Sequence, residues 1–326
     1  HPTKIETKDE LMQADDFDAV AFRDATTVYV WDTETLEIVN RLQAHTNTVD
    51  TVRFHPAGDG RLLTGAWDGQ IILWDVLTGE QLMTYEGHTG RALMVRFVGD
   101  GTQFVSVGTN GEAFLWDTDS GAQVRLYPHG ELSVNAVDVN TDGTLFAMTT
   151  SSGDNKVYLW DLLSGVQIRT YDDHEASVNE VRFHPSGEWL VSSAWDSTVR
   201  VWDIDSGAEV RDFSGHNGHT FGIDFTQDGA IMLTTSQDTT VRMWDWATGE
   251  ELQRFDLHSD WIQEVVFFAD DQLAMSASQD ETVRIWRINR TAESLEAFAL
   301  ENRYIRSFTC SELDVYRLDD SECVQE

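Results

Sequence analysis

Residues 174–207 read HEASVNEVRF HPSGEWLVSS AWDSTVRVWD IDSG. Residues 177–183, apolar at Val178, Val181 and Phe183, alternate for the most part and predict a half-buried β-strand, which the turn-forming sequence His-Pro-Ser-Gly ends. Further strands are expected over 189–193 and over 198–202, which is rich in β-branched residues, and the chain then turns into 208–213. The segment therefore predicts four short strands joined by tight turns.

The same pattern returns along the chain at an almost constant interval. Its third strand ends each time in Trp, at intervals of 43, 42, 44, 42, 42 and 42 residues: Trp31, Trp74, Trp116, Trp160, Trp202, Trp244 and Trp286. Asp follows each Trp except the last, which Arg287 follows. A repeat of about 40–45 residues that ends in Trp-Asp is typical of a four-stranded propeller blade. We therefore expect one all-β domain of seven blades, with repeats over about 17–310 and terminal segments 1–16 and 311–326.

The composition is strongly acidic and restricts the class of partner. The 326 residues include 57 acidic and 22 basic side chains, for a formal net charge of −35. Such a surface repels phosphate backbones and carries no basic patch, so we expect no nucleic-acid partner. Two explanations stay open: solubility in a salt-rich cell, where ions screen self-repulsion, and attraction of basic partners.

The sequence offers few signs of its location. No run of 18 apolar residues occurs, so no membrane span is expected. The chain begins with His1 rather than Met and lacks the apolar segment of a signal peptide, which argues against a retained signal peptide and indicates a processed or excised piece. With no signal peptide and no membrane span expected, we expect a cytoplasmic protein. We expect a monomer, and a sensor or docking domain of a larger signalling protein stays an alternative. Cys310 and Cys323 could pair across a local turn, but two thiols make no disulfide scaffold.

Two further motifs accompany the Trp-Asp pairs. Gly-His occurs at Gly87-His88 and Gly215-His216, and in most repeats Asp stands six residues before the Trp. Together these motifs resemble the WD-repeat (WD40) β-propeller family over essentially residues 17–310, and the pattern is similar to that of bacterial WD-repeat proteins and the β subunit of G proteins. The resemblance implies a closed propeller and a non-catalytic scaffold that binds a protein or peptide.

In that family each blade carries a buried quartet of His, Ser or Thr, Asp and Trp joined by hydrogen bonds. Matching positions assigns six quartets: His45, Thr64, Asp68 and Trp74; His88, Ser106, Asn110 (in place of Asp) and Trp116; His129, Thr150, Asp154 and Trp160; His174, Ser192, Asp196 and Trp202; His216, Thr234, Asp238 and Trp244; His258, Ser276, Asp280 and Trp286. Ser, His and Asp in contact can form a nucleophilic triad, but a hydrolase needs one set beside an oxyanion hole rather than six equivalent copies. We therefore expect a structural role and no catalytic residue.

The histidines also argue against a metal. Six of the ten belong to the quartets, His55 and His184 precede Pro in turns, and His1 is terminal, which leaves His219. No Cys/His cluster has zinc-ligand spacing, and neither a twelve-residue calcium loop nor a Gly-rich phosphate loop occurs. We expect no metal and no cofactor. The competing hypothesis, an enzyme or small-ligand site in the central channel, would need acids or ligands that the repeat does not explain.

The two ends of the repeat depart from the pattern. The first unit lacks the His and has Ala25 at the Asp position, and residues 4–16 are too charged for a good inner strand. Residues 293–300 align with an outer strand, and residues 304–310 align with an inner strand. We therefore expect 293–300 to complete the seventh blade and 304–310 to complete the first, so that both termini close the ring. Residues 311–326 stay unassigned, and an eighth blade would lack its Trp-bearing strand.

The resemblance finally implies a binding face. In the family, partners dock on the face with the inter-blade loops, through the third and fifth residues after the blade His and the residue before the turn Asp. In this chain the third positions are Thr48, Arg91, Ser177, His219, Trp261 and Tyr304, the fifth are Asp50, Leu93, Asn179, Phe221, Gln263 and Arg306, and the last are Trp67, Thr109, Gly153, Trp195, Gln237 and Gln279. An insertion after His129 shifts the fourth blade to Ser133 and Asn135.

Aromatic and Arg side chains at these positions form the candidate partner-binding surface, because these residue types dominate binding energies at interfaces. They are Trp67, Trp195, Trp261, Arg91, Phe221, His219, Tyr304 and Arg306. The alternative interpretation is that these rings pack against neighbouring loops and cap the blades.

Overall fold

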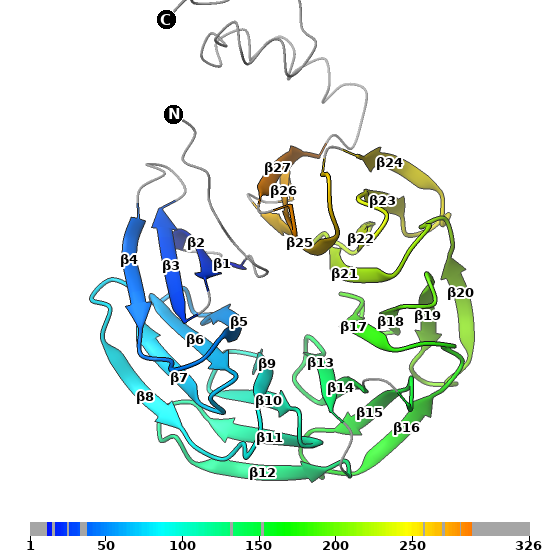
Figure 1. Cartoon of the computed structure of the whole chain (residues 1–326). Coiled ribbons are helices and arrows are strands. Elements are labelled where there is room, and N and C mark those ends of the chain that lie inside the picture. Colours follow the sequence, from blue (N-terminus) through cyan, green and yellow to red (C-terminus); the bar gives the residue numbers. More distant parts are fainter. Residues whose placement is uncertain are drawn as a thin grey trace, which may run out of the picture. The chain divides into compact units, whose positions relative to one another are not determined.

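The computed structural model describes residues 12–14, 17–24, 26–32, 38–130, 133–150, 153–256, 258–268, 271–280 and 282–288. Within them every regular element is a β-strand (Figure 1). The strands form seven antiparallel sheets, six of four strands and one of three. Each sheet takes its strands in sequence order, so each hairpin leads directly into the next strand. This is the architecture of a β-propeller with four-stranded antiparallel blades.

The strand bounds repeat closely from sheet to sheet. The first sheet contains β1 (Met12–Ala14), β2 (Phe17–Asp24), β3 (Thr27–Asp32) and β4 (Ile38–Gln43), and the second contains β5 (Val49–Phe54), β6 (Arg61–Ala66), β7 (Ile71–Asp75) and β8 (Gln81–Tyr85). The third contains β9 (Ala92–Val98), β10 (Gln103–Gly108), β11 (Glu112–Asp117) and β12 (Gln123–Pro128), and the fourth β13 (Val134–Val139), β14 (Leu145–Thr150), β15 (Val157–Asp161) and β16 (Gln167–Tyr171). The fifth contains β17 (Val178–Phe183), β18 (Trp189–Ala194), β19 (Val199–Asp203) and β20 (Glu209–Phe213), the sixth β21 (Thr220–Phe225), β22 (Ile231–Ser236), β23 (Val241–Asp245) and β24 (Glu251–Phe255), and the seventh β25 (Ile262–Phe268), β26 (Leu273–Ser278) and β27 (Val283–Arg287).

Sequence patterning predicted the strands of the fifth sheet to within one residue at each end. Alternation holds from Val181 to Phe183, where Arg182 between two buried residues is partly exposed, whereas Val178 and Val181 stand three residues apart and are both buried because the register shifts between Val178 and Glu180. In six sheets the register of the third and fourth strands shifts at the Trp residue, as between Val201 and Trp202.

Neighbouring sheets pack through the Trp of the third strand. The first strands lie beside one another in order, from β5 through β9, β13, β17 and β21 to β25. Trp74 joins a buried cluster with Val28 and Val30 of the preceding sheet. Trp31 of the first sheet packs in the same way against Met275 and other residues of the seventh sheet. The Trp recurs once per sheet because it forms the packing contact between that sheet and the sheet before it.

The innermost position of the first sheet corrects one sequence prediction. The sequence assigns this inner place to residues 304–310 because residues 4–16 are mostly charged, yet β1 pairs with β2 there and takes it. The three residues of β1, Met-Gln-Ala, carry no charge themselves, although Glu10 precedes them and Asp15 and Asp16 follow. Residues 293–326, with both predicted C-terminal strands and both Cys residues, lie outside the described residues.

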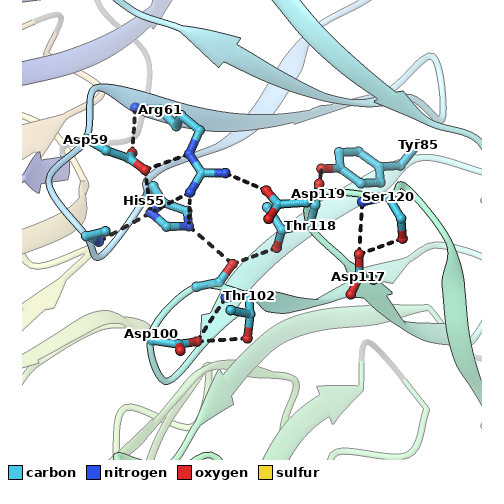
Figure 2. Close-up of polar contacts among 12 residues, drawn as sticks. His55, Asp59, Arg61, Tyr85, Asp100, Thr102, Asp117, Thr118, Asp119 and Ser120 are labelled. Carbon is cyan, nitrogen blue, oxygen red and sulfur yellow. Dashed lines mark hydrogen bonds and ion pairs between the residues drawn. The ribbon is translucent and has the colours of Figure 1, made fainter.

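The turns at the opposite end of the sheets from the Asp turns also join neighbours (Figure 2). His55, in the turn after β5, lies with its Nε2 atom 3.2 Å from the carbonyl oxygen of Gly101 in the next sheet. Arg61 reaches the same sheet through an ion pair of 2.9 Å with Asp119. His184 repeats the first bond between the fifth and sixth sheets at 2.9 Å. These His-Pro turns therefore hold neighbouring sheets together, a role that the sequence analysis did not predict.

Candidate functional site

One backbone hydrogen bond recurs at the turns between the second and third strands. The N–H group of the residue before the turn Asp or Asn donates to the carbonyl oxygen of the third residue after the blade position of His. The pairs are Trp67 with Thr48 (2.8 Å), Thr109 with Arg91 (3.1 Å), Trp195 with Ser177 (2.9 Å), Gln237 with His219 (2.9 Å) and Gln279 with Trp261 (2.8 Å). Two of the three predicted contact positions are thus adjacent in five sheets.

Four of the six predicted quartets are complete. In the fifth sheet, His174 lies 2.8 Å from Asp196 and 2.7 Å from the Ser192 hydroxyl, to which Trp202 donates at 2.9 Å. The same three contacts join the quartets of the second, sixth and seventh sheets: His45, Thr64, Asp68 and Trp74; His216, Thr234, Asp238 and Trp244; His258, Ser276, Asp280 and Trp286.

The partners of each imidazole fix the direction of these hydrogen bonds. The Nδ1–H group donates to the carboxylate, which has no proton to give, so Nε2 accepts from the hydroxyl, whose oxygen in turn accepts from the indole. Burial lowers the pKa of His258 below its ordinary value, although Asp280 opposes this effect, so the ring is neutral at pH 7. Burial alone would raise the pKa of Asp280, but hydrogen bonds from Thr282, Ser259 and His258 lower it to about 2.

The third sheet keeps only part of its quartet. His88 and Trp116 both contact the Ser106 hydroxyl at 2.8 Å. Asn110 instead donates to Thr89 and Glu112, and the buried Nδ1 atom of His88 makes no hydrogen bond. Burial lowers the pKa of His88 to about 4, and the effect that opposes it comes from the Asn110 amide rather than from a carboxylate.

The fourth sheet contradicts the predicted quartet. Thr150 donates to Asp154 at 3.3 Å, a contact that the complete quartets lack, and it bonds neither His129 nor Trp160. The Nε2 atom of His129 and the Nε1 atom of Trp160 are buried without a hydrogen-bond partner. Asp154 instead accepts a hydrogen bond from the Tyr158 hydroxyl, and the Tyr158 ring lies 3.9 Å from that of His129.

Turn length explains this error. The assignment placed the hydroxyl ten residues before the Trp, as in Ser192 and Trp202. Six residues separate β14 from β15, however, whereas four separate β18 from β19. Trp160 therefore pairs across the sheet with Phe146, and Met148 occupies the place that Ser192 holds in the fifth sheet. A thioether is a weak acceptor, so the quartet cannot form.

A pocket of about 410 Å³ opens among the first strands and the turns of the quartets. Its lining is Asp50, Leu93, Met94, Asn135, Asn179, Glu180, Trp195, Phe221, Trp261, Gln263, Glu264 and Gln279. All six fifth-position residues of the second to seventh sheets take part, including Asn135 of the fourth. No quartet residue lines this pocket, so the imidazole–hydroxyl pairs do not face it.

Two groups of side chains flank the pocket. The first, the aromatic rim, consists of Trp195, His219, Phe221 and Trp261: Trp195 stacks on His219 with ring centroids 4.7 Å apart, and Phe221 stacks on Trp261 at 6.1 Å. In the second, the Trp67–Arg91 pair, the guanidinium carbon lies 3.7 Å from the ring centroid, within cation–π range. Trp67 also donates to Asp50 of the pocket wall. The exposed fractions are 36% for Trp67 and 46% for Trp195.

A buried charge network lies on the first strands beneath the pocket. Arg96 and Arg182 both contact the Oε1 atom of Glu180, at 3.4 and 3.3 Å. Arg182 also reaches Glu264 at 3.5 Å and Asp138 at 3.7 Å. These ion pairs join strands of four different sheets. Since breaking a buried pair leaves an uncompensated charge, the network favours this one arrangement of the first strands.

The described residues contain no group of three or more His, Cys, Asp or Glu side chains arranged to hold a metal ion. They also contain no helix long and apolar enough to cross a membrane.

Comparison with protein families agrees with the repeat and the quartets. The family described as "WD domain, G-beta repeat" (WD40) matches six segments, at residues 36–75, 79–117, 121–161, 165–203, 207–245 and 249–287. The chain belongs to the WD40 family. Each matched segment ends at the residue after a repeat Trp, and together they confirm the predicted WD-repeat resemblance.

Individual WD40 relatives match over shorter stretches. The guanine nucleotide-binding protein subunit beta of Arabidopsis thaliana is 31% identical over 126 residues, which are 36% of this chain and 33% of the relative. The small ribosomal subunit protein RACK1 of Caenorhabditis elegans is 32% identical over 94 residues, 28% of this chain and 29% of the relative. Apoptotic protease-activating factor 1 of Rattus norvegicus is 29% identical over 144 residues, 44% of this chain but 11% of the relative. The chain thus covers a third or less of the length of each of these relatives.

The structure brings most of the predicted surface residues together. Trp195, Phe221 and Trp261 line the pocket, His219 stacks on Trp195, and Trp67 and Arg91 form a pair beside it. Tyr304 and Arg306 lie outside the described residues. The alternative interpretation was that these rings only pack against neighbouring loops. The rings do contact one another, but Trp67 and Trp195 also keep exposed faces.

Sequence reasoning missed the acids of the pocket, Glu180 and Glu264. Both are buried, with exposed fractions of 5% and 7%. Each stands directly before an apolar residue of a first strand, in Asn-Glu-Val and Gln-Glu-Val. Their position in the sequence could have revealed them, because a charged residue in the middle of a predicted buried strand needs a partner inside the protein.

Proposed function

We propose that this chain is a non-catalytic scaffold that binds a protein or peptide on the face carrying the Asp turns. The observation that carries the proposal is the aromatic rim beside an open pocket, at positions that the family uses for partners. Trp and Arg side chains grouped around a concavity are among the residue types that contribute most to interface energy, and Trp67 and Trp195 keep exposed faces here. The expectations of a cytoplasmic and monomeric protein stay predictions.

The proposal includes a seven-bladed ring. Seven Trp residues in register support this count. The packing of Trp31 also supports it: a repeat Trp packs against the preceding sheet, and for Trp31 of the first sheet that neighbour is the seventh sheet. A ring suits a scaffold because it leaves no unpaired blade at either end and holds the face rigid. The outer strand of the seventh blade remains assigned to residues 293–300 by sequence alignment alone.

The quartets support the absence of catalysis. Four complete copies are buried, and none faces the pocket, whereas a hydrolytic triad needs one copy beside a bound substrate. Their hydrogen bonds satisfy polar groups that would each cost about 1–3 kcal/mol if buried alone. The same residues are therefore needed for folding, and their arrangement gives no free nucleophile.

The test is capture of partners from an extract of the native cells by the protein carrying both Trp67→Ala and Trp195→Ala. Neither side chain is fully buried, so the double variant stays folded, while the proteins that the wild type captures, identified by mass spectrometry, are no longer captured. The matched control is Leu77→Ala with Leu163→Ala, which removes two exposed apolar side chains from turns at the other end of the third strands. Undiminished capture by the Trp variant, or equal loss in the control, contradicts the proposal.

A further inference from the structure

The turn between β10 and β11 lacks hydrogen bonds that its counterparts in four other sheets form. In the second sheet, the Asp68 carboxylate accepts from the N–H groups of Gln70 at 3.0 Å and Thr46 at 2.8 Å. The corresponding two bonds are present at Asp196, Asp238 and Asp280. Among the described residues, Asn110 in their place accepts neither bond, and its Oδ1 atom is buried without a hydrogen-bond partner.

The main chain of the same turn also lacks a bond. In the second sheet the N–H group of Gly69 donates to the carbonyl oxygen three residues earlier at 3.0 Å, and Ser197 and Thr239 make the same bond in the fifth and sixth sheets. The N–H group of Gly111 donates to no described residue. Its φ of 72° lies in the left-handed region, which favours glycine. The nitrogen that follows Asn110 is therefore neither bonded to a carbonyl nor screened by a side chain of its own.

An asparagine that precedes glycine can react with its own main chain. The nitrogen of the glycine loses its proton and attacks Cγ of the asparagine, so that a new N–Cγ bond closes a cyclic imide and the amide nitrogen leaves as ammonia. Water then opens the ring. Breaking the new bond gives aspartate in ordinary linkage, and breaking the original peptide bond gives isoaspartate. Glycine favours ring closure because it has no side chain in the way. Water is the one reactant, so neither an enzyme nor an oxidant is needed.

His88 provides a partner for the carboxylate that this reaction creates. Its buried Nδ1 atom makes no hydrogen bond with any described residue. The Asn110 amide raises the pKa of His88 against the larger effect of burial, which places the two side chains close together. In the fifth sheet the equivalent groups, His174 Nδ1 and the Asp196 carboxylate, lie 2.8 Å apart. A carboxylate at position 110 can therefore accept the hydrogen bond that is missing in the third sheet.

We propose that Asn110 deamidates spontaneously in the folded protein, and that the aspartate formed in ordinary linkage completes the third quartet with His88, Ser106 and Trp116. Ser106 already contacts both rings, so the carboxylate is the one group that this quartet needs. The Asn110 amide, which donates to Glu112, is lost in the reaction. Glu112 is partly exposed, so its side chain can turn toward solvent and away from the new charge.

The sequence contains one other Asn-Gly pair, Asn217-Gly218, which serves as a comparison. Asn217 is exposed and directly follows His216, whose Nδ1 atom already lies 3.0 Å from Asp238. An acid at position 217 therefore gains no buried partner. Deamidation at Asn110 differs because its product fills a place in the packed sheet.

The experiment follows the amide at position 110 in the folded full chain. The protein carries Asn217→Gln, which removes the other Asn-Gly pair, and is incubated at about pH 6 and about pH 9 before peptide mapping by mass spectrometry. We expect Asn110 to become an acid at least tenfold faster than Asn47, an exposed residue that β-branched Thr48 follows. The reaction is faster at the higher pH, because the attacking nitrogen must lose its proton. Asn110→Gln in the same background is the matched control and gains no acid, because its longer side chain closes a ring much more slowly.

A second measurement tests what the product does. Anion-exchange chromatography isolates the chain with the added charge, and Asn110→Asp is the reference for the product in ordinary linkage. We expect a nuclear magnetic resonance titration to show a higher pKa of His88 in this product than in the unmodified chain, because a carboxylate stabilises the charged ring. Conversion of Asn110 no faster than that of Asn47, or conversion in the urea-unfolded chain alone, overturns the proposal. Isoaspartate as the sole product, or an unchanged pKa of His88, does the same.

Discussion

Removing one hydroxyl should have very different effects in two sheets, although the sequence places it identically in both. Thr234 and Thr150 each stand ten residues before a repeat Trp, and both are fully buried. The Thr234 hydroxyl contacts His216 and Trp244, each at 2.8 Å. The Thr150 hydroxyl has neither contact and reaches only Asp154 at 3.3 Å and the Lys156 carbonyl oxygen at 3.5 Å. The matched change is Thr→Val, which keeps the shape of the side chain.

The magnitudes follow from the groups that each change leaves without a partner. Thr234→Val leaves the indole N–H and the imidazole Nε2 buried and unsatisfied, at about 1–3 kcal/mol each, so the free energy of unfolding falls by about 2–6 kcal/mol. Thr150→Val removes one long hydrogen bond to an acid that keeps the Tyr158 hydroxyl, and the loss is about 1 kcal/mol or less.

Urea unfolding measures both variants, followed by tryptophan fluorescence and by circular dichroism, since coincident transitions are needed to convert midpoints into free energies. Equal destabilisation by the two changes would refute the reasoning, because it would mean that hydroxyl position along the sequence, rather than contact with the indole and imidazole, sets the effect. A loss below about 1 kcal/mol in Thr234→Val would do the same.

Three further outcomes are expected. Because burial lowers the pKa of His88 to about 4, this residue becomes protonated near pH 6.5 in the unfolded chain but stays neutral at that pH in the folded chain. Stability is therefore full above pH 6.5 and declines by about 3 kcal/mol toward pH 4 through this residue; unfolding titrations of His88→Gln should show a shallower decline, and an unchanged one would contradict the assignment. Asn110→Asp, tested in the background Glu112→Gln to avoid a like-charge contact, gives His88 Nδ1 an acceptor and should raise the unfolding free energy by about 1 kcal/mol relative to Glu112→Gln alone. Molar KCl should raise the melting temperature by screening the net charge of −35, and a flat or falling response would count against salt adaptation.

The fold could be predicted from the sequence because its signals are local and repeated. Apolar positions such as Val178, Val181 and Phe183, bounded by turn residues, predicted the strands, and a constant Trp interval predicted their grouping into blades. Where an interval changed, the prediction failed: the extra residues between β14 and β15 moved Met148 into the hydroxyl position, and counting back from Trp160 could not reveal this. Only the pairing of β14 with β15 decides which residue faces the indole.

The candidate site could be predicted in part for a related reason. Positions counted from the blade His and from the turn Asp predicted that Phe221, Trp261 and Trp195 lie on one face, since the repeat places equivalent residues at equivalent heights. The acids Glu180 and Glu264 were missed, because their proximity depends on how first strands from different sheets approach each other. That distance is a property of the packed sheets, and no spacing along the chain encodes it.

The recurring bond between the turn N–H and the neighbouring carbonyl has a bearing on how such proteins diversify. Every residue except proline supplies both main-chain groups, so the loops keep their shape whichever side chains they display. Substitutions at Trp67, Gln237 or Gln279 can therefore change the surface that a partner contacts while the backbone of the loop stays the same. New binding specificities can arise in this way without a new fold.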